Sequence, residues 1–290
     1  AIVNIQNIVV LLFAKAFNMI ILLRTLLHRI RLLKWAVLPR STALDFYGEA
    51  IKSVAGRWNT ELGPVTTYHA LFDVLRQNNF SGNLTEIGGG YSTVLAKTLF
   101  DSSEVKITSI DAYLQKYYRI LNSKNNTRNF LSSINSINSI TVSLDDVRKA
   151  LPEIVGRLME YEPSALKDAL TQFVSDKEVL ESICLDVDRK DLSALYNLFL
   201  DHDSFKVDIA FYEKFGALTG DWACKDLAKE NKVIDCLFLD CGEVSSLAEF
   251  LILEKNLKSG SYLLLHDIYF PKSIKNFFLA ALLTLDDRWS

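Results

Sequence analysis

The chain has 290 residues, of which 49% are hydrophobic and 23% are charged, with a formal net charge of −3 and a pI near 5.9. This composition predicts a globular chain with a sizeable core, and the charge argues against a general nucleic-acid binder. Its four cysteines form no CxxC or Cys/His spacing, which excludes a disulfide scaffold and favours a reducing, cytoplasmic location.

Residues 1–40 are apolar and basic, without a single acidic side chain. Residues 8–23 read IVVLLFAKAFNMIILL, a helix of roughly 24 Å against a bilayer core of about 30 Å. Residues 24–38 combine a basic face with an apolar stripe. We expect a helix that is peripheral to an anionic membrane surface or anchored in the membrane, and the alternative is packing on the chain's own core or on a second copy.

After a helical lead-in over residues 41–82, residues 83–290 alternate strand and helix patterns. Apolar runs predict strands at Leu84–Ile87, Val105–Ile110, Ile137–Leu144, Val233–Leu239 and Tyr262–Leu265. Helical patterns lie between them at Ser92–Phe100, Ala112–Ile134, Val147–Leu158 and Ser246–Leu257, with a turn at Lys258–Gly260. This alternation predicts an α/β fold with a doubly wound, mostly parallel sheet and helices on both faces.

An acidic side chain lies at the end of every predicted strand. These residues are Glu86, Asp111, Asp145, Asp240 and Asp267. Because the carboxyl ends of parallel strands meet at one edge of a sheet, where ligands bind, we expect a site there. A single carboxylate in such a place more often caps a helix, but the five together favour a ligand site.

Residues 85–93 read TEIGGGYST, a glycine-rich loop between a predicted strand and a predicted helix. Thr93 stands where the GxGxxG dinucleotide motif has its third glycine, and the chain has no GxxxxGK[ST] motif. The carboxylate of Glu86 would repel a pyrophosphate and suits a ligand with a cationic part. Asp111, at the end of the next strand, is placed to bind the hydroxyls of a ribose.

Four motifs, in order along the chain, resemble those of the class I S-adenosylmethionine-dependent methyltransferases, in the branch that methylates small molecules on oxygen. They are Glu86–Thr93, Ile110-Asp111, Ser143–Asp146 with Leu151–Glu153, and Phe238–Gly242 followed by Leu257–Asp267. The resemblance covers about residues 80–160 and 233–290 and implies a Rossmann-like sheet. It also implies a cofactor site made of Glu86, Gly88, Gly89, Gly90, Tyr91, Ser92, Asp111, Asp145 and Asp146.

The same resemblance places Asp240 and Asp267 where metal-dependent members hold Mg²⁺, an ion that prefers oxygen ligands. Two features depart from those members: Ile268 stands where they have Asn, and Glu243 lies where they carry a lysine base. Asp240, Glu243 and His266 are the candidate catalytic residues. His266 is the candidate general base, with a strand-end histidine bonded to backbone as the alternative.

The expected activity is transfer of a methyl group to a small or medium acceptor, at a hydroxyl oxygen. A nicotinamide-dinucleotide oxidoreductase and a non-catalytic membrane-associated scaffold remain the alternatives. A helical insertion over residues 152–232 is expected to cap the carboxyl edge, or else to form the surface of a homo-oligomer. Its aromatic residues favour core packing over ligand stacking, whereas Trp58 and Tyr68 are expected to close over the cofactor.

Overall fold

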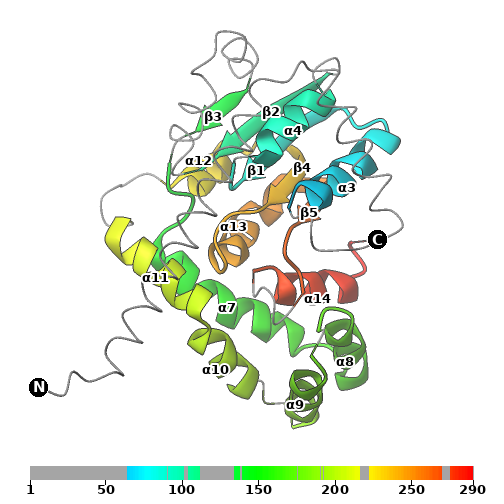
Figure 1. The fold of residues 1–290 in the computed structure, drawn as a ribbon, viewed down its shortest axis with the longest axis vertical. Helices are drawn as coiled ribbons and strands as arrows, with labels where there is room; N and C mark the ends of the chain where they lie inside the picture. Colours follow the sequence, from blue (N-terminus) through cyan, green and yellow to red (C-terminus); the bar gives the residue numbers. More distant parts are fainter. Residues whose placement is uncertain are drawn as a thin grey trace, which may run out of the picture.

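We analysed a computed structural model of the chain (Figure 1). It describes residues 64–89, 91–100, 104–111, 134–137, 139–174, 176–189, 191, 193–215, 222–269 and 275–289. The predicted N-terminal helix over residues 1–40, the first part of the lead-in, Trp58 and most of the helix expected over Ala112–Ile134 lie outside these residues. Among the described residues, no helix has the length and apolar character needed to cross a bilayer.

Five strands form one sheet in the order β3-β2-β1-β4-β5, and every neighbouring pair is parallel. Their bounds are β1 Gly82–Ile87, β2 Val105–Ile110, β3 Asn135–Ile137, β4 Ile234–Leu239 and β5 Leu257–Leu265. The predicted α/β fold with a parallel sheet is thereby confirmed. The order reverses between β1 and β4, and such a switch point is where open α/β sheets bind ligands.

Helices cover both faces of the sheet. The helices that enclose it are α3 Pro64–Gln77, α4 Tyr91–Phe100, α7 Leu144–Leu158, α12 Ala223–Lys229, α13 Ser245–Leu253 and α14 Phe277–Leu285. Side chains of β4 alternate between two apolar clusters. Phe238 packs with α3 and α4, whereas Leu237 and Leu239 pack with α7, α13 and α14. The apolar strand is therefore buried on both sides, as its sequence predicts.

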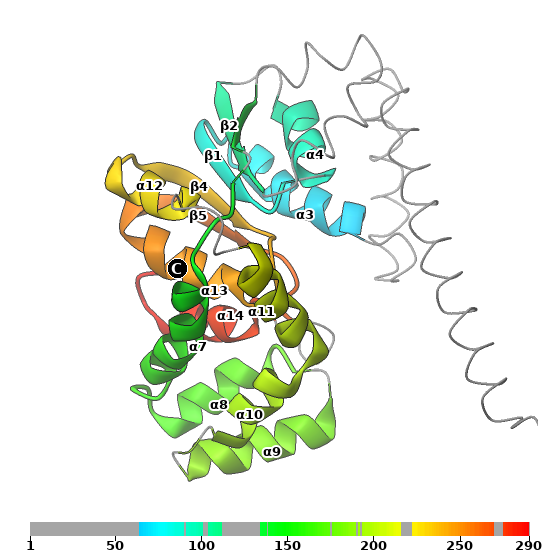
Figure 2. The ribbon, with the colours of Figure 1, turned by 90° about the vertical axis from the view of Figure 1, so that its left-hand side faces the viewer.

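The expected insertion is helical. Beyond α7 it contains α8 Pro163–Thr171, α9 Lys177–Asp188, α10 Ser193–Asp201 and α11 Asp203–Phe215. Figure 2 shows α8, α9 and α10 at one end of the molecule, with α13 and α14 between them and the sheet. Phe199 and Tyr212 are buried in the same apolar cluster as α13 and α14, so for these two aromatic residues the predicted core role is confirmed.

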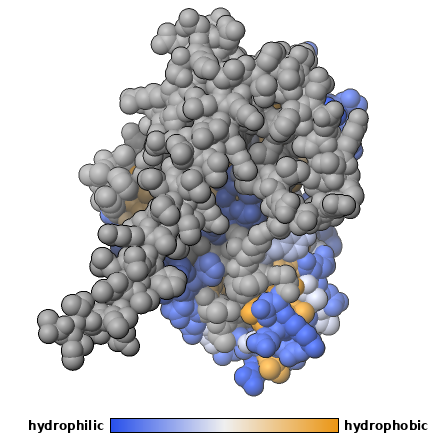
Figure 3. Space-filling view, viewed as in Figure 1, coloured by the Kyte–Doolittle hydropathy of each residue, from blue (hydrophilic) through white to orange (hydrophobic). Residues whose placement is uncertain are grey.

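On the face seen in Figure 3, the visible described part of the insertion is mostly hydrophilic, with a smaller hydrophobic area. The exposed large hydrophobic residues of the described chain come from different elements. They are Val74, Leu185, Val207, Val233 and Tyr269. Isolated residues of this kind are normal on a protein surface and indicate no docking site.

The predicted third strand, Ile137–Leu144, is wrong in its extent. β3 ends at Ile137, and the following segment pairs with α12 instead of the sheet: Ala223 and Cys224 donate their N–H groups to the carbonyls of Ile140 and Thr141. Ser143 then caps α7 in a capping box, in which its side chain accepts from the N–H of Asp146 and the Asp146 carboxylate accepts from the N–H of Ser143.

The predicted turn at Lys258–Gly260 lies inside β5. Ile234 pairs with Leu257 and Cys236 with Tyr262, so the intervening residues of β5 form a bulge. Gly260 has a φ of +86°, a backbone conformation that side-chain-bearing residues rarely adopt. The helix expected at Ser246–Leu257 is also shorter, since α13 ends at Leu253 and a 3₁₀ turn, η1 Glu254–Asn256, leads into β5.

Candidate functional site

The carboxyl edge of the sheet brings four of the predicted positions into one row. The residue after each of four strands donates its backbone N–H to the last residue of the neighbouring strand: Gly88 to Ile110, Asp111 to Ile137, Asp240 to Ile87 and His266 to Leu239. The parallel ladder therefore continues one residue beyond the strands. Gly88, Asp111, Asp240 and His266 are fixed at the same level of one edge, as expected for a ligand site.

Gly88 allows the loop after β1 to touch the loop after β4. Its φ is +94°, and a Cβ placed there would lie 2.2 Å from the carbonyl oxygen of Asp240. Glycine is therefore required at this position for backbone packing. Gly89 is buried beside it, whereas Gly90 and the side chain of Tyr91 lie outside the described residues.

Glu86 is fully buried beneath this loop. Its Oε2 accepts hydrogen bonds from the hydroxyls of Thr93 and Ser109, and Oε1 has no hydrogen-bond partner. Burial raises the pKa of Glu86 to about 7, although hydrogen bonds from Ser92, Thr93 and Ser109 oppose the rise. Ser92 is itself buried beside this carboxyl group, and its contact with a cofactor stays a prediction.

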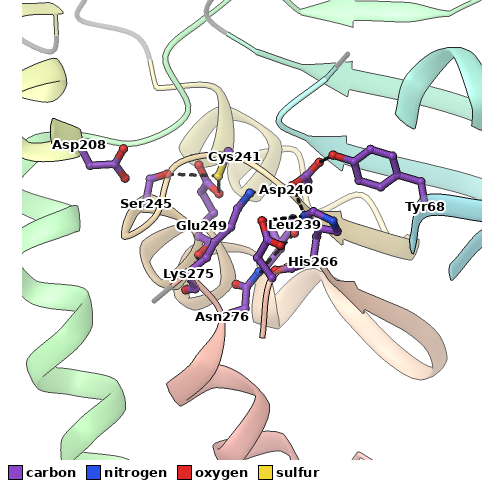
Figure 4. Close-up of polar contacts among 12 residues, drawn as sticks. Tyr68, Asp208, Leu239, Asp240, Cys241, Ser245, Glu249, His266, Lys275 and Asn276 are labelled. Carbon is purple, nitrogen blue, oxygen red and sulfur yellow. Dashed lines mark hydrogen bonds and ion pairs between the residues drawn. The ribbon is translucent and has the colours of Figure 1, made fainter. Parts of the chain in front are cut away.

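Asp240 is the centre of a polar cluster at the ends of β4 and β5 (Figure 4). Its Oδ1 lies 2.7 Å from Nζ of Lys275 and 2.9 Å from Nδ1 of His266, and its Oδ2 accepts a hydrogen bond of 2.6 Å from the hydroxyl of Tyr68. Nδ1 of His266 also lies 3.0 Å from Oδ2 of Asp267. These five side chains come from α3, β4, β5 and the segment before α14.

His266 is buried between the two carboxylates. Its Nδ1 is close enough to both for ion pairing, but neither contact is aligned as a hydrogen bond. Burial favours the neutral imidazole, but Asp240 and Asp267 outweigh it and raise the pKa of His266 to about 9. His266 is therefore an imidazolium at neutral pH and in this state cannot act as the predicted general base.

The pKa values of Asp240 and Asp267 shift in the opposite direction to that of His266. Burial alone raises the pKa of Asp240, but His266 and Lys275 outweigh burial and hold it below its usual value. Asp267 is shifted down in the same way, chiefly by His266. Burial and the neighbouring Asp240 raise the pKa of Tyr68, which stays a neutral donor. Its ring lies 4.7 Å from the imidazole of His266, centre to centre.

Asn276 ties the ends of β4 and β5 together. Its Nδ2 donates to the carbonyl of His266 at 2.6 Å and to that of Leu239 at 3.4 Å. Its own N–H donates to the carbonyl of Asp267, a residue held in the left-handed region with a φ of 58°. The side chain of Asn276 is completely buried, and its hydrogen bonds fix the backbone of His266 and Asp267.

Asp145 and Asp146 do not end a strand and belong to the first turn of α7. Asp145 is exposed, and Asp146 completes the capping box and pairs with Lys225 at 2.6 Å. Burial raises the pKa of Asp146, but Lys225 and Ser143 outweigh it and lower the pKa overall. The structure thus gives Asp146 a helix-capping role, and the position of Asp145 or Asp146 beside the adenine stays a prediction.

Glu243 is not a member of the Asp240 cluster. It lies in the loop before α13, where its N–H and that of Val244 point to the carboxylate of Asp208 on α11. Burial raises the pKa of Asp208. Gly242 makes this approach possible, because a Cβ there would lie 2.5 Å from Oδ2 of Asp208. One helix of the insertion is therefore attached to the loop after β4, next to the candidate site.

A second buried carboxyl group, Glu249 on α13, lies behind this loop. Its Oε1 accepts a hydrogen bond of 2.5 Å from Thr141, and its Oε2 accepts one from the thiol of Cys241. Tyr212 of α11 lies 3.2 Å from the same Thr141 hydroxyl. Burial raises the pKa of Glu249 to about 7 and the pKa of Cys241 well above its usual value, which keeps the thiol protonated and unreactive.

The predicted Mg²⁺ ligands do come together. Asp240, His266 and Asp267 offer ligand atoms within 4.8 Å of one another. However, the hydroxyl of Tyr68 and the ammonium of Lys275 already donate to the oxygens of Asp240, and the imidazole of His266 lies 2.9 Å from one of them. A nitrogen ligand also suits Mg²⁺ poorly. The residues present therefore do not fit a resident Mg²⁺ ion.

Sequence reasoning missed Lys275, Asn276 and Glu249. Lys275 and Asn276 lie beyond the last recognised motif and carry no spacing that marks them. Glu249 is the single carboxylate of an apolar helix that reads SSLAEFLIL. Because a buried carboxyl group needs hydrogen-bond partners, such a residue indicates a buried polar network. Comparison with family models, with curated proteins and with solved structures finds no match to this chain.

Proposed function

We propose that the chain is an S-adenosylmethionine-dependent methyltransferase that acts on a hydroxyl group of a small or medium acceptor. The observation that carries this proposal is the presence of two carboxyl groups beside the glycine loop, at the switch point of the parallel sheet. There, Glu86 keeps an unpaired Oε1 and Asp111 stands at the end of β2. Acidic groups in these two places suit a ligand with an amino group, a ribose and a positive charge.

The cofactor fits this edge chemically. When bound, S-adenosylmethionine supplies a methyl group on a positively charged sulfur. Asp111 would hold the ribose hydroxyls, and Glu86 would support the methionine end through the loop above it. The contact between Gly88 and the backbone of Asp240 places the His266 cluster directly beside that loop.

In this proposal, His266 receives the proton of the acceptor. Its Nε2 makes no hydrogen bond with any described residue, while Asp240 and Asp267 hold Nδ1. A further positive charge in the same cleft lowers the pKa of an imidazolium. His266 would then lose its proton before the reaction and accept one from the acceptor hydroxyl, with Asp240 and Asp267 stabilising the charge that forms.

A nicotinamide dinucleotide is the less favoured ligand because the buried Glu86 and the missing third glycine both disfavour its pyrophosphate. Calorimetry on the full chain with S-adenosylmethionine, S-adenosylhomocysteine and NAD⁺ distinguishes a methyltransferase from a nicotinamide-dinucleotide oxidoreductase. We expect heat from the first two ligands only, and an Asp111→Ala variant should bind them at least ~10-fold more weakly.

Binding of NAD⁺ alone would overturn the proposal in favour of an oxidoreductase. Binding of none of the three ligands would favour a non-catalytic scaffold. If S-adenosylmethionine binds, mass spectrometry of a panel of hydroxylated small molecules incubated with the protein identifies the acceptor. His266→Asn should then lower turnover without changing cofactor affinity.

A further inference from the structure

Lys275 is a charged side chain in a buried place. Its relative exposure is 5%, and its Nζ lies 2.7 Å from Oδ1 of Asp240. Burial lowers the pKa of a lysine, but the attraction of Asp240 and of the neighbouring acidic groups outweighs it and raises the pKa of Lys275. An ammonium is removed from water only where a fixed partner compensates it, so Lys275 is a resident cation of this cluster.

Among the described residues, the carboxylates of Asp240 and Asp267 lie beside two basic side chains, those of Lys275 and His266. Lys275 and His266 approach the same oxygen of Asp240. The other oxygen is taken by the hydroxyl of Tyr68.

A divalent ion bound to Oδ1 of Asp240 would lie about 2.1 Å from it and hence no more than about 5 Å from Nζ of Lys275. At this distance, in a buried cluster, the charges repel strongly. We infer that the ammonium of Lys275 takes the electrostatic place of a divalent metal at this edge, and that Asp240, His266 and Asp267 bind no metal while Lys275 is present.

This inference concerns the cation and does not require the proposed methyl transfer. If the proposed function also holds, the acceptor is oriented by charged side chains, without chelation to an ion. A pair of adjacent oxygens on the acceptor, which chelation would need, is then not required.

Titration of the full chain with Mn²⁺, read by the electron paramagnetic resonance of the free ion, tests the inference without cofactor or acceptor. The unsubstituted chain and Lys275→Arg, which keeps the positive charge, should bind Mn²⁺ only with a Kd above ~1 mM. Lys275→Met, which keeps the length and removes the charge, should bind at least ~10-fold more tightly. Adding Asp267→Asn to Lys275→Met should abolish that gain.

Two results would overturn the inference. One is tight Mn²⁺ binding by the unsubstituted chain that Asp267→Asn alone weakens. The other is a folded Lys275→Met protein, verified by its thermal melting, that gains no affinity. If Lys275→Met does not fold, Lys275→Gln takes its place, and the comparison of the unsubstituted chain with Asp267→Asn still decides. Calorimetry with S-adenosylmethionine on the same samples reports separately on the proposed function.

Discussion

Two buried glutamates of this molecule have the same burial and different surroundings. Glu86 at the end of β1 and Glu249 on α13 are both fully buried, and burial raises the pKa of each to about 7. Both oxygens of Glu249 accept hydrogen bonds, from Thr141 and Cys241. In Glu86 only Oε2 does so, and Oε1 has no partner.

The difference teaches that burial and a shifted pKa do not by themselves identify a ligand site. The network of Glu249 is completed by protein groups, and through Thr141 it reaches Tyr212 of the insertion. It therefore connects the insertion to the core. Glu86 has similar burial but an incomplete set of partners, and it lies under the glycine loop. An unsatisfied buried acceptor is costly, and this cost supports the proposed ligand site at that end of the sheet.

The pH dependence of stability tests the property that the two carboxyl groups share. Each has a pKa of about 7 in the folded chain against 4.5 for an ordinary glutamate, so the folded state binds more protons between these values. Below about pH 4.5 these groups are protonated in both states and do not lower the free energy of unfolding. As the pH rises from about 4.5 to about 7, the free energy of unfolding falls by about 3 kcal/mol for each group. Urea unfolding across this range should give a flatter curve for Glu86→Gln and for Glu249→Gln. An unchanged curve in both would contradict the shared shift.

Glu249→Ala tests the structural side of the comparison. Loss of the carboxyl group leaves the thiol of Cys241 and the hydroxyl of Thr141 without their acceptor and opens a cavity. We expect a loss of about 3 kcal/mol in the free energy of unfolding, measured by urea denaturation. The affinity of the folded variant for S-adenosylmethionine should stay the same, and a large loss of affinity would break the distinction between the two glutamates.

Glu86→Gln tests the ligand side. The amide oxygen can still accept from Thr93 and Ser109, while the amide nitrogen replaces the unpaired Oε1 with a donor. Stability near pH 6 should therefore change little. Calorimetry should show an affinity for S-adenosylmethionine about 10-fold lower, because the substitution removes the negative charge beneath the loop that would hold the methionine end. Glu249→Gln is the matched control and should bind the cofactor as the unsubstituted chain does.

Asp146→Ala gives the smallest expected effect. Asp146 was predicted at the cofactor, but it completes the capping box of α7. Its loss should lower the free energy of unfolding by about 1 kcal/mol, as removal of a helix cap does. Thermal unfolding measures this change, and calorimetry should find the cofactor affinity unaltered. A clear loss of affinity would instead support the predicted position of Asp146 at the cofactor.

The fold was predictable because its signals are local. Apolar runs such as IDCLFL are long enough to mark strands buried on both faces, and the glycine loop marks the turn from β1 into α4. The third strand failed because Ile140–Val142 are as apolar as a strand while their backbone pairs with α12. The capping-box pattern at Ser143–Asp146 was the available signal for the helix start.

The site was predictable only in part. Asp240, His266 and Asp267 follow strands, so the topology alone brings them to one edge. Two of their partners, Tyr68 and Lys275, come from α3 and from the segment before α14. Long-range packing brings these side chains together, so no local spacing in the sequence predicts the contacts.

The bulge in β5 also bears on how copies of the chain encounter one another. β5 is an outer strand of the sheet among the described residues, and an uninterrupted outer strand offers its backbone to strands of other molecules. Lys258, held at 3.0 Å by Asp235, and the left-handed Gly260 interrupt this strand where it begins. A bulged and charged stretch of this kind disfavours strand-to-strand association between copies of the chain.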